Sequence, residues 1–306
     1  MSQELSAPEL AGIAGHLMAA KMFSLAACVM LLYDIFITMA DEVEQIWSRS
    51  FTPMTVLWFL NRYLSPLGYI VIITSFHQPW SKEVCNRYVL YPEALKVVTS
   101  FTIGVIFILR LFAIYSRSKS IAALGCLALA AELGIKIWSF TDGTSLDLPP
   151  GIVGCILVGR NPNRFVFTWV AELAFDSIMF FTTLYRVVHY NRIRHGSARN
   201  LLDLILRDGV VYFGVIFVAN LLTVLMFLLA PADIKAINAS FSTLITSLMV
   251  SRLILNLRGA VDHSIYVESV HEMYGTSFIP YQGEPESPNS KTLFGIRQEL
   301  SAIRRA

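Results

Sequence analysis

Charged side chains are scarce in this chain, and their scarcity excludes a surface that faces mainly water. Of the 306 residues, 15% are Asp, Glu, Lys or Arg, whereas 55% are hydrophobic and the mean hydropathy is +0.58. A soluble domain carries about 25% charged residues, because charges cover the surface that water reaches. The formal net charge of +2 is too small to indicate a nucleic-acid partner. The composition therefore favours a protein surrounded by lipid.

Sequence motifs of several well-defined classes are missing as well. There is no Gly-x-Ser-x-Gly elbow, no His-Glu-x-x-His pair and no phosphate-binding Gly loop, so no enzyme class is indicated. The six His residues lie at or beyond the ends of the apolar segments, which disfavours a zinc hydrolase, and we expect neither a metal nor a cofactor. The last apolar segment lacks the central Lys of a retinal protein and the Asn-Pro-x-x-Tyr ending of the commonest hormone receptors. Any receptor likeness is therefore architectural.

Long apolar runs predict an all-α polytopic membrane protein, a bundle of seven transmembrane helices. About 20 apolar residues, each rising 1.5 Å, cross the ~30 Å hydrocarbon core. Runs of this kind occupy residues 18–39, 54–76, 93–115, 121–140, 165–189, 209–230 and 237–257. Pro53 and Pro92 favour helix starts, and Gly259 favours a helix end after the seventh run. No internal repeat is visible, which disfavours an inverted-repeat transporter.

Positive charge in the short loops indicates the orientation of the bundle. One side collects nine basic residues, namely Arg49, Arg117, Lys119, Arg186, Arg192, Arg194, Arg199, Arg207 and Arg258. The other side collects six, namely Lys21, Lys82, Arg87, Arg160, Arg164 and Lys235. We therefore expect a short N-terminal segment outside (1–17), the membrane domain (18–258) and a cytoplasmic tail (259–306). Within that tail, residues 293–305 form either an amphipathic helix on the inner leaflet or an unstructured end.

The four cysteines fall into two groups. Cys28 and Cys126 lie inside predicted spans, where a thiol behaves as a small apolar group. Cys85 and Cys155 lie in the second-to-third and fourth-to-fifth loops, which share the outer, oxidising side in this orientation. The sequence is consistent with a Cys85–Cys155 disulfide or with two free loop thiols.

Four ionisable residues lie deep inside predicted spans. Each costs roughly 2.5–3.5 kcal/mol at a helix centre on insertion scales. Glu132 and Lys136 lie four residues apart in the fourth run, as do Glu172 and Asp176 in the fifth, so each pair shares a helix face. We expect Lys136 to pair with Glu172 or with Glu132, which leaves at least one carboxyl group that holds or shares a proton. The cluster is either a polar clasp between helices or a site for a ligand, an ion or a proton.

A second group of charges lies toward the predicted cytoplasmic side. Asp34 of the first run and Arg62 of the second reach similar depths, so a structural ion pair is expected there. Beyond the first run, Trp47 is expected to mark the headgroup level. Arg110 and Arg252 lie near the inner ends of the third and seventh runs, where their side chains are expected to reach toward water.

Several short stretches resemble a known family. The N-terminal ones are Tyr33-Asp34, Asp41-Glu42-Val43, Ile46-Trp47 and Leu60-Asn61-Arg62-Tyr63, and the later ones are Glu132-Leu133 with Lys136-Ile137-Trp138, residues 236–242 and residues 252–258. Together they resemble fungal seven-pass membrane proteins, of the mushroom-forming fungi, that carry the domain of unknown function six-five-three-three, at about residues 22–72. The resemblance implies a seven-helix membrane protein and no established activity.

These observations lead to a non-enzymatic, receptor-like sensor in the plasma membrane or an endomembrane as the leading hypothesis. Its expected partners are the lipid bilayer, a small-molecule ligand from the outer face and a cytoplasmic protein that meets the basic fifth-to-sixth loop. A small-solute or proton-coupled transporter that uses Glu132 and Asp176 is the alternative. A structural membrane component without a ligand is the third hypothesis.

Overall fold

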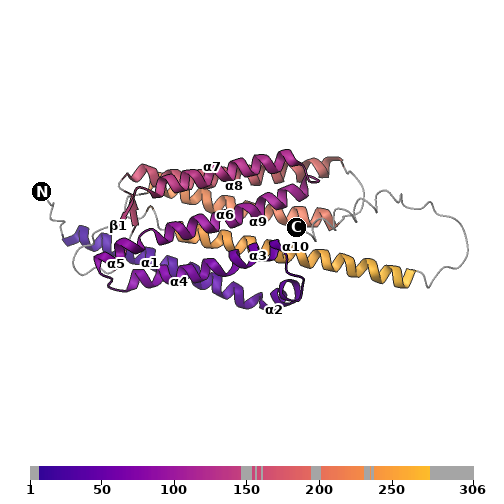
Figure 1. Ribbon diagram of the computed structural model, residues 1–306, viewed down its shortest axis with the longest axis horizontal. Coiled ribbons are helices and arrows are strands. Elements are labelled where there is room, and N and C mark those ends of the chain that lie inside the picture. Colours follow the sequence, from indigo (N-terminus) through magenta and orange to yellow (C-terminus); the bar gives the residue numbers. More distant parts are fainter. Residues whose placement is uncertain are drawn as a thin grey trace, which may run out of the picture.

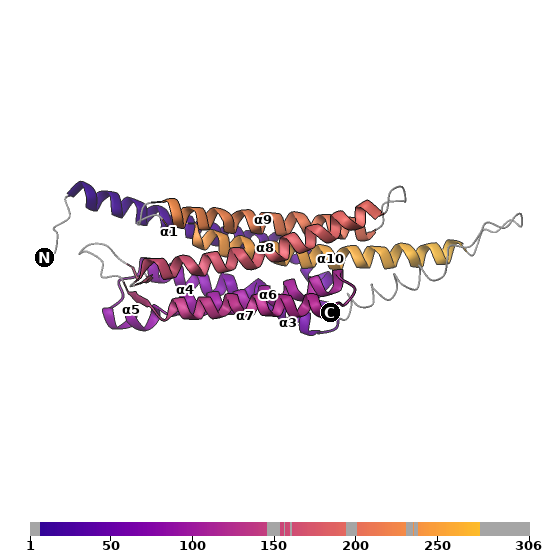
Figure 2. The ribbon, with the colours of Figure 1, turned by 90° about the horizontal axis from the view of Figure 1, so that it is seen from above.

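The protein is a bundle of long, roughly parallel and antiparallel helices (Figures 1 and 2). The computed structural model describes residues 7–145, 154–155, 157–159, 161–193, 201–230, 235 and 238–275. In this part of the chain, seven helical segments are long and apolar enough to cross a membrane. The predicted all-α, seven-span fold is therefore confirmed, and the chain is a multi-pass integral membrane protein.

Most spans are single helices. They are α1 (Ala7–Ile37), α6 (Tyr91–Ile114), α7 (Lys119–Phe140), α8 (Pro162–Ile193), α9 (Leu201–Leu229) and α10 (Ala239–Gly275). The second span consists of α3 (Pro53–Phe59), a π-helical turn η2 (Leu60–Leu64) and α4 (Ser65–His77). Thr52 caps α3, since its hydroxyl accepts the Thr55 backbone N–H at 3.3 Å, and Pro53 follows in the first turn.

Short elements connect the spans. They are α2 (Met39–Glu42), the π-helical turn η1 (Val43–Trp47), α5 (Lys82–Tyr88), β1 (Gly143–Ser145) and β2 (Leu157–Gly159). The two strands pair antiparallel, with Gly143 opposite Gly159. A disulfide joins Cys85 of α5 to Cys155, which precedes β2. We call this the disulfide end of the bundle.

The N-terminal part of α1, α5 and β1 lie at one end in Figure 1, whereas α2 and the C-terminal part of α10 lie at the other. We call the latter the opposite end. The second-to-third and fourth-to-fifth connections therefore share one end, as an alternating path of seven spans requires. This arrangement agrees with the bundle topology expected from the apolar runs.

Helix α10 corrects the predicted end of the seventh span. Gly259 was expected to stop the helix, but α10 continues to Gly275 and extends beyond the bundle (Figure 1). Glycine inside a helix costs only about 1 kcal/mol relative to alanine, and no proline follows before Gly275. Gly259 instead allows close packing, because an added Cβ would lie 2.9 Å from Gln45 Nε2. The predicted 293–305 helix lies outside the described residues.

Two glycines bring the central helices close together. A Cβ on Gly68 of α4 would clash with the Leu95 side chain of α6, and a Cβ on Gly104 of α6 would clash with Leu129 of α7. Small residues at such contacts let helix backbones approach, as is usual in membranes. Because Lys96 follows Leu95, and Glu132 lies one turn beyond Leu129, these contacts also position the buried charges described below.

Candidate functional site: buried charge networks and a lateral groove

Lys136 is the centre of a buried charge cluster near the disulfide end. The side chain is fully buried on α7, and its Nζ lies 2.5 Å from Glu132 Oε1 and 3.2 Å from Glu172 Oε2. Nζ also donates to Ser100 Oγ at 2.5 Å. The structure thus places Lys136 against both carboxylates that the sequence offered as alternatives.

Lys96 of α6 is a member of this cluster that the sequence analysis missed. Its Nζ lies 2.9 Å from Glu172 Oε2 and 3.1 Å from the centroid of the Trp169 ring. The same nitrogen donates to Thr243 Oγ1 of α10 at 3.5 Å. A cation on an aromatic face is attracted to the ring as well as to its carboxylate. The sequence did contain a signal for this residue, because Lys96 lies just inside the third apolar run, 93–115. We call Lys96, Glu132, Lys136 and Glu172 the charge cluster.

Asp176 has a different environment. Its Oδ2 accepts a hydrogen bond from Asn220 Nδ2 of α9, and Asn220 Oδ1 accepts one from Ser242 Oγ of α10. All three side chains are buried. We call these three residues the polar chain. The charge cluster joins α6, α7 and α8, and the polar chain joins α8 to α9 and α10. Five of the spans are thereby joined through polar side chains.

Carboxylates outnumber lysines in this region. Glu132, Glu172 and Asp176 are buried, whereas the cations are Lys96 and Lys136. Among the described residues, Glu132 Oε2 has no hydrogen-bond partner, and the same holds for Oε2 of nearby Glu93. Buried charges need partners in a medium of low polarity. The region therefore has spare acceptor capacity for a proton or another donor.

Arg62 is the centre of a second buried network, toward the opposite end. The π-helical turn η2 carries it, and its side chain is fully buried. Its Nη1 lies 2.6 Å from Asp34 Oδ2, and its Nη2 donates to Thr38 Oγ1 and to the Asp34 backbone oxygen. The residue pair expected from the sequence is thus in direct contact.

Glu42 is the acidic partner in this network that the sequence analysis missed. It was expected outside the first span, but at the junction of α2 and η1 its side chain is fully buried. Its Oε2 lies 3.6 Å from Arg62 Nε, while its Oε1 accepts hydrogen bonds from Trp47 Nε1, at 3.0 Å, and from the Tyr63 hydroxyl. A hydropathy pattern does not reveal that helical structure resumes in α2 after α1 ends at Ile37, so it gave no reason to expect Glu42 in the interior.

Arg110 and Arg252 differ from each other, although both were expected to reach water. Arg110 is 9% exposed, and its guanidinium lies 5.3 Å from the Phe213 ring centroid with no hydrogen-bond partner in the described part of the chain, so the expectation is wrong for it. The Nε of Arg252 lies 2.5 Å from Asp34 Oδ1, and its side chain is 38% exposed. Asp34 is therefore shared by two guanidinium groups.

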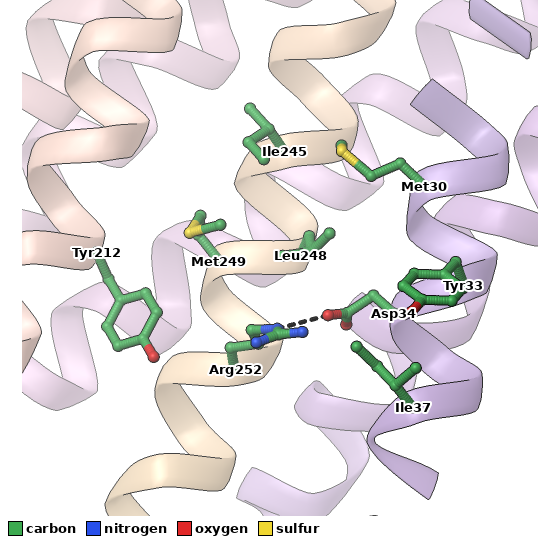
Figure 3. A pocket seen from close by; sticks show the side chains of 9 residues that line it. All are labelled: Met30, Tyr33, Asp34, Ile37, Tyr212, Ile245, Leu248, Met249 and Arg252. Carbon is green, nitrogen blue, oxygen red and sulfur yellow. Dashed lines mark hydrogen bonds and ion pairs between the residues drawn. The ribbon is translucent and has the colours of Figure 1, made fainter. Parts of the chain in front are cut away.

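A groove of about 330 Å³ lies between α1, α9 and α10, beside this second network. Asp34, Arg252 and Tyr212 are its polar lining residues. Figure 3 shows Asp34 of α1 and Arg252 of α10 joined across the groove, with Tyr212 of α9 on the far side. None of the residues that line the groove belongs to the charge cluster.

Part of the opposite-end network lies in a segment that matches a recognised sequence family. Residues 22–67 match the model described as "Family of unknown function (DUF6533)", which confirms the resemblance over this segment. The segment runs from α1 to the start of α4 and includes Asp34, Glu42 and Arg62. No curated protein matches the chain. Among the described residues, no group of three His, Cys, Asp or Glu side chains is placed to hold a metal ion.

Proposed function

We propose that the chain is a non-enzymatic, receptor-like sensor in a fungal plasma membrane or endomembrane. The observation that carries this proposal is that Glu172 of α8 is shared by Lys96 of α6 and Lys136 of α7. A carboxylate with two partners on two other helices can keep one ion pair while it loses the other. In this proposal the two ion pairs of Glu172 define two arrangements of the bundle, and a ligand that favours one of them shifts the population.

The polar chain supports the same proposal. Asp176, Asn220 and Ser242 extend the buried contacts to α9 and α10. A shift of α8 against α6 or α7 is then transmitted to α10, which also carries Arg252 in the opposite-end network. The two networks thus lie on one connected set of helices, and the disulfide end would face outward.

Two routes for a ligand fit this architecture. The sequence favours entry from the outer face, beside the Cys85 and Cys155 loops. The groove between α1, α9 and α10 offers a lateral route from the lipid. The basic fifth-to-sixth loop, where we expect a cytoplasmic protein partner, includes residues 194–200, which lie outside the described part of the chain.

A proton-coupled or small-solute transporter is the second candidate, and the surplus of buried carboxylates favours it. Glu132 and Asp176 would then carry the proton or coordinate the solute. Purified protein in proteoliposomes with an imposed proton gradient would show proton flux that Glu132→Gln abolishes. The sensor proposal expects no flux above that of protein-free liposomes. A purely structural component is the third candidate and would show neither flux nor a second conformation.

The sensor proposal is tested by measuring whether the charge cluster has two arrangements. Spin labels are placed at Ser120 of α7 and His189 of α8, which are exposed at the opposite end, in a Cys28→Ser/Cys126→Ser background that retains the disulfide. Glu172→Gln is expected to add a second, discrete label-to-label distance in lipid nanodiscs. Glu83→Gln, which removes the acid of an exposed ion pair with Arg87, is the matched control and should leave the distances unchanged.

Two results of the distance measurement would contradict the sensor proposal. If Glu172→Gln lowers thermal stability but leaves a single unchanged distance, the cluster is a clasp and the sensor proposal is wrong. A general broadening of the distances together with loss of helical signal also contradicts it, because it indicates unfolding rather than a second state.

A further inference from the structure

We propose that the groove between α1, α9 and α10 binds a lipophilic carboxylic acid, which enters sideways from the bilayer and places its carboxylate on Arg252. This inference names the ligand class of the sensor and rests on the proposed function for its consequence. It is argued from four features of the groove: its exposure to lipid, its depth, its unused donors and its size.

The groove opens on the lipid-facing surface of the bundle. Tyr33 and Ile37 of α1, which form its rim, are 64% and 50% exposed, and both belong to a membrane span. Its floor is α10, the most deeply buried span. The apolar lining consists of Met30, Ile37, Ile245, Leu248 and Met249, together with the ring of Tyr33 (Figure 3). An apolar chain is the natural occupant of such walls, since it comes from the surrounding lipid.

Arg252 lies inside the seventh span, Ala239–Ala260, eight residues before the end of that span. It precedes Arg258 by six residues on the same helix, which places it about 9 Å further into the bilayer. Side chains on a helix also lean toward the N-terminus, which for α10 means away from the opposite end. An unpaired N–H group in hydrocarbon costs several kcal/mol. A polar group that arrives with the ligand would therefore be strongly favoured at this depth.

The donors of Arg252 are only partly used. Its Nε faces Asp34 Oδ1, while the other oxygen of Asp34 is occupied by Arg62. In the described part of the chain, Asp34 is the only acidic side chain within ion-pair distance of Arg252. Among the described residues, no hydrogen-bond acceptor faces the terminal nitrogens Nη1 and Nη2, which remain as a planar pair of donors that matches the two oxygens of a carboxylate.

The size and depth of the groove select a free acid rather than a bilayer phospholipid. Its volume of about 330 Å³ lies at the small end of the ~300–1,000 Å³ found for ligand sites. A phospholipid phosphate lies at headgroup level, beyond the ends of the spans, whereas Arg252 lies eight residues before the end of its span. A medium-chain acid has its carboxylate at one end, and it can move within the bilayer to this depth.

The test uses the full chain in phosphatidylcholine nanodiscs, with decanoic acid as the probe. Binding of radiolabelled decanoic acid is measured at equilibrium, and a diazirine analogue of the same acid is cross-linked and mapped by mass spectrometry. Saturable binding is expected, with cross-links confined to α1, α9 and α10. Decanol, which has the same chain without the charge, is expected to compete at least tenfold more weakly.

Two variants and one control make the test specific. Arg252→Gln is expected to weaken decanoic acid binding at least tenfold. Met249→Trp fills the groove and retains the Arg252–Asp34 ion pair, so it should abolish binding even if Arg252→Gln folds poorly. Arg258→Gln is the same substitution on the same helix outside the groove, and it should bind as the unaltered protein does.

Each outcome separates this inference from the proposed function. Absence of saturable binding, or equal binding in Arg252→Gln, overturns the ligand class, while the second label distance in Glu172→Gln would still support a sensor. Equal competition by decanol indicates an acyl-chain groove filled by annular lipid and also overturns the inference. Cross-links to a second copy of the chain identify the groove as a dimer contact and overturn it as well. Specific binding that leaves the label distances unchanged supports the groove and contradicts the sensor.

Discussion

Lys96 Nζ and Glu172 Oε2 lie 2.9 Å apart and join α6 to α8 across the interior of the bundle. The same carboxylate oxygen lies 3.2 Å from Lys136 Nζ of α7. Three spans therefore meet at a single carboxylate, and each lysine has a further contact: the Trp169 ring for Lys96 and Glu132 for Lys136. The two lysines are therefore expected to contribute differently to the stability of the bundle, and this difference can be measured.

Lys136→Met is expected to destabilise the bundle more than Lys96→Met. Removal of Lys136 leaves Glu132 without an ion-pair partner among the described residues and costs about 3–5 kcal/mol, the usual loss when one partner of a buried pair is removed. Removal of Lys96 leaves Glu172 paired with Lys136, so about half of that loss is expected. Thermal unfolding in detergent, followed by tryptophan fluorescence, compares the two. Arg87→Gln, at an exposed ion pair, should stay within about 0.5 kcal/mol.

Equal losses for the two lysine variants would contradict this ranking. They would mean that Glu132 is already neutralised by a proton, so that Lys136 contributes no more than Lys96 does.

The Cys85–Cys155 disulfide is expected to stabilise the disulfide end. It closes a segment with a sequence separation of 70 residues. Chain entropy predicts a contribution of about 4.4 kcal/mol for a loop of this length, and disulfides typically contribute about 2–4 kcal/mol. Cys155→Ser should lower the unfolding temperature, and dithiothreitol should lower that of the unaltered protein by a similar amount. Cys126→Ser, which changes an exposed free thiol, is the control. A further decrease when dithiothreitol is added to Cys155→Ser would show that the reagent acts elsewhere.

The same two cysteines test the orientation of the bundle. If the disulfide end faces outward, a membrane-impermeant phosphine followed by an impermeant maleimide should label Cys85 and Cys155 in intact cells. Without reduction, neither should react, because both sulfurs are in the disulfide. For protein at the cell surface, labelling that requires permeabilised cells would place this end in the cytoplasm and reverse the proposed topology.

The sequence predicted the spans well, because bilayer thickness sets a length that apolar runs must match. It also selected Glu132, Lys136, Glu172 and Asp176, since helical spacing shows which charges share a face. Lys96 and Glu42 were missed because both lie near span ends, where hydropathy places charges in water. Their burial depends on how neighbouring helices pack and on the fold of α2 and η1, and a one-dimensional pattern contains neither.

The wrongly predicted helix end at Gly259 shows a related limit of prediction from the local sequence. A glycine after an apolar run is usual both for a helix end and for a close helix contact, and the local sequence does not distinguish them. The neighbour that decides is Gln45, which lies more than two hundred residues earlier in the chain. The same holds for Arg252, whose partner Asp34 lies on the first span.

Arg62 and Arg252 share Asp34, and their burial predicts different effects on stability. Arg62 is fully buried and also contacts Glu42 and Thr38, so Arg62→Ala leaves Asp34 and Glu42 short of a cation and should cost about 3–5 kcal/mol. Among the described residues, the partly exposed Arg252 contacts one acid, and Arg252→Ala should cost less than half as much as Arg62→Ala. Chemical unfolding of the purified protein measures both.

Charge alone does not account for this difference, and a third variant shows why. Arg62→Lys keeps the positive charge but cannot reach Asp34, Thr38 and Glu42 together, because a lysine has one nitrogen where arginine has three. It should therefore recover less than half of the stability lost in Arg62→Ala. Full recovery would mean that Asp34 needs only a nearby cation and that the π-helical turn η2 is not required to aim the guanidinium. Glu83→Gln remains the reference for an ion pair in water.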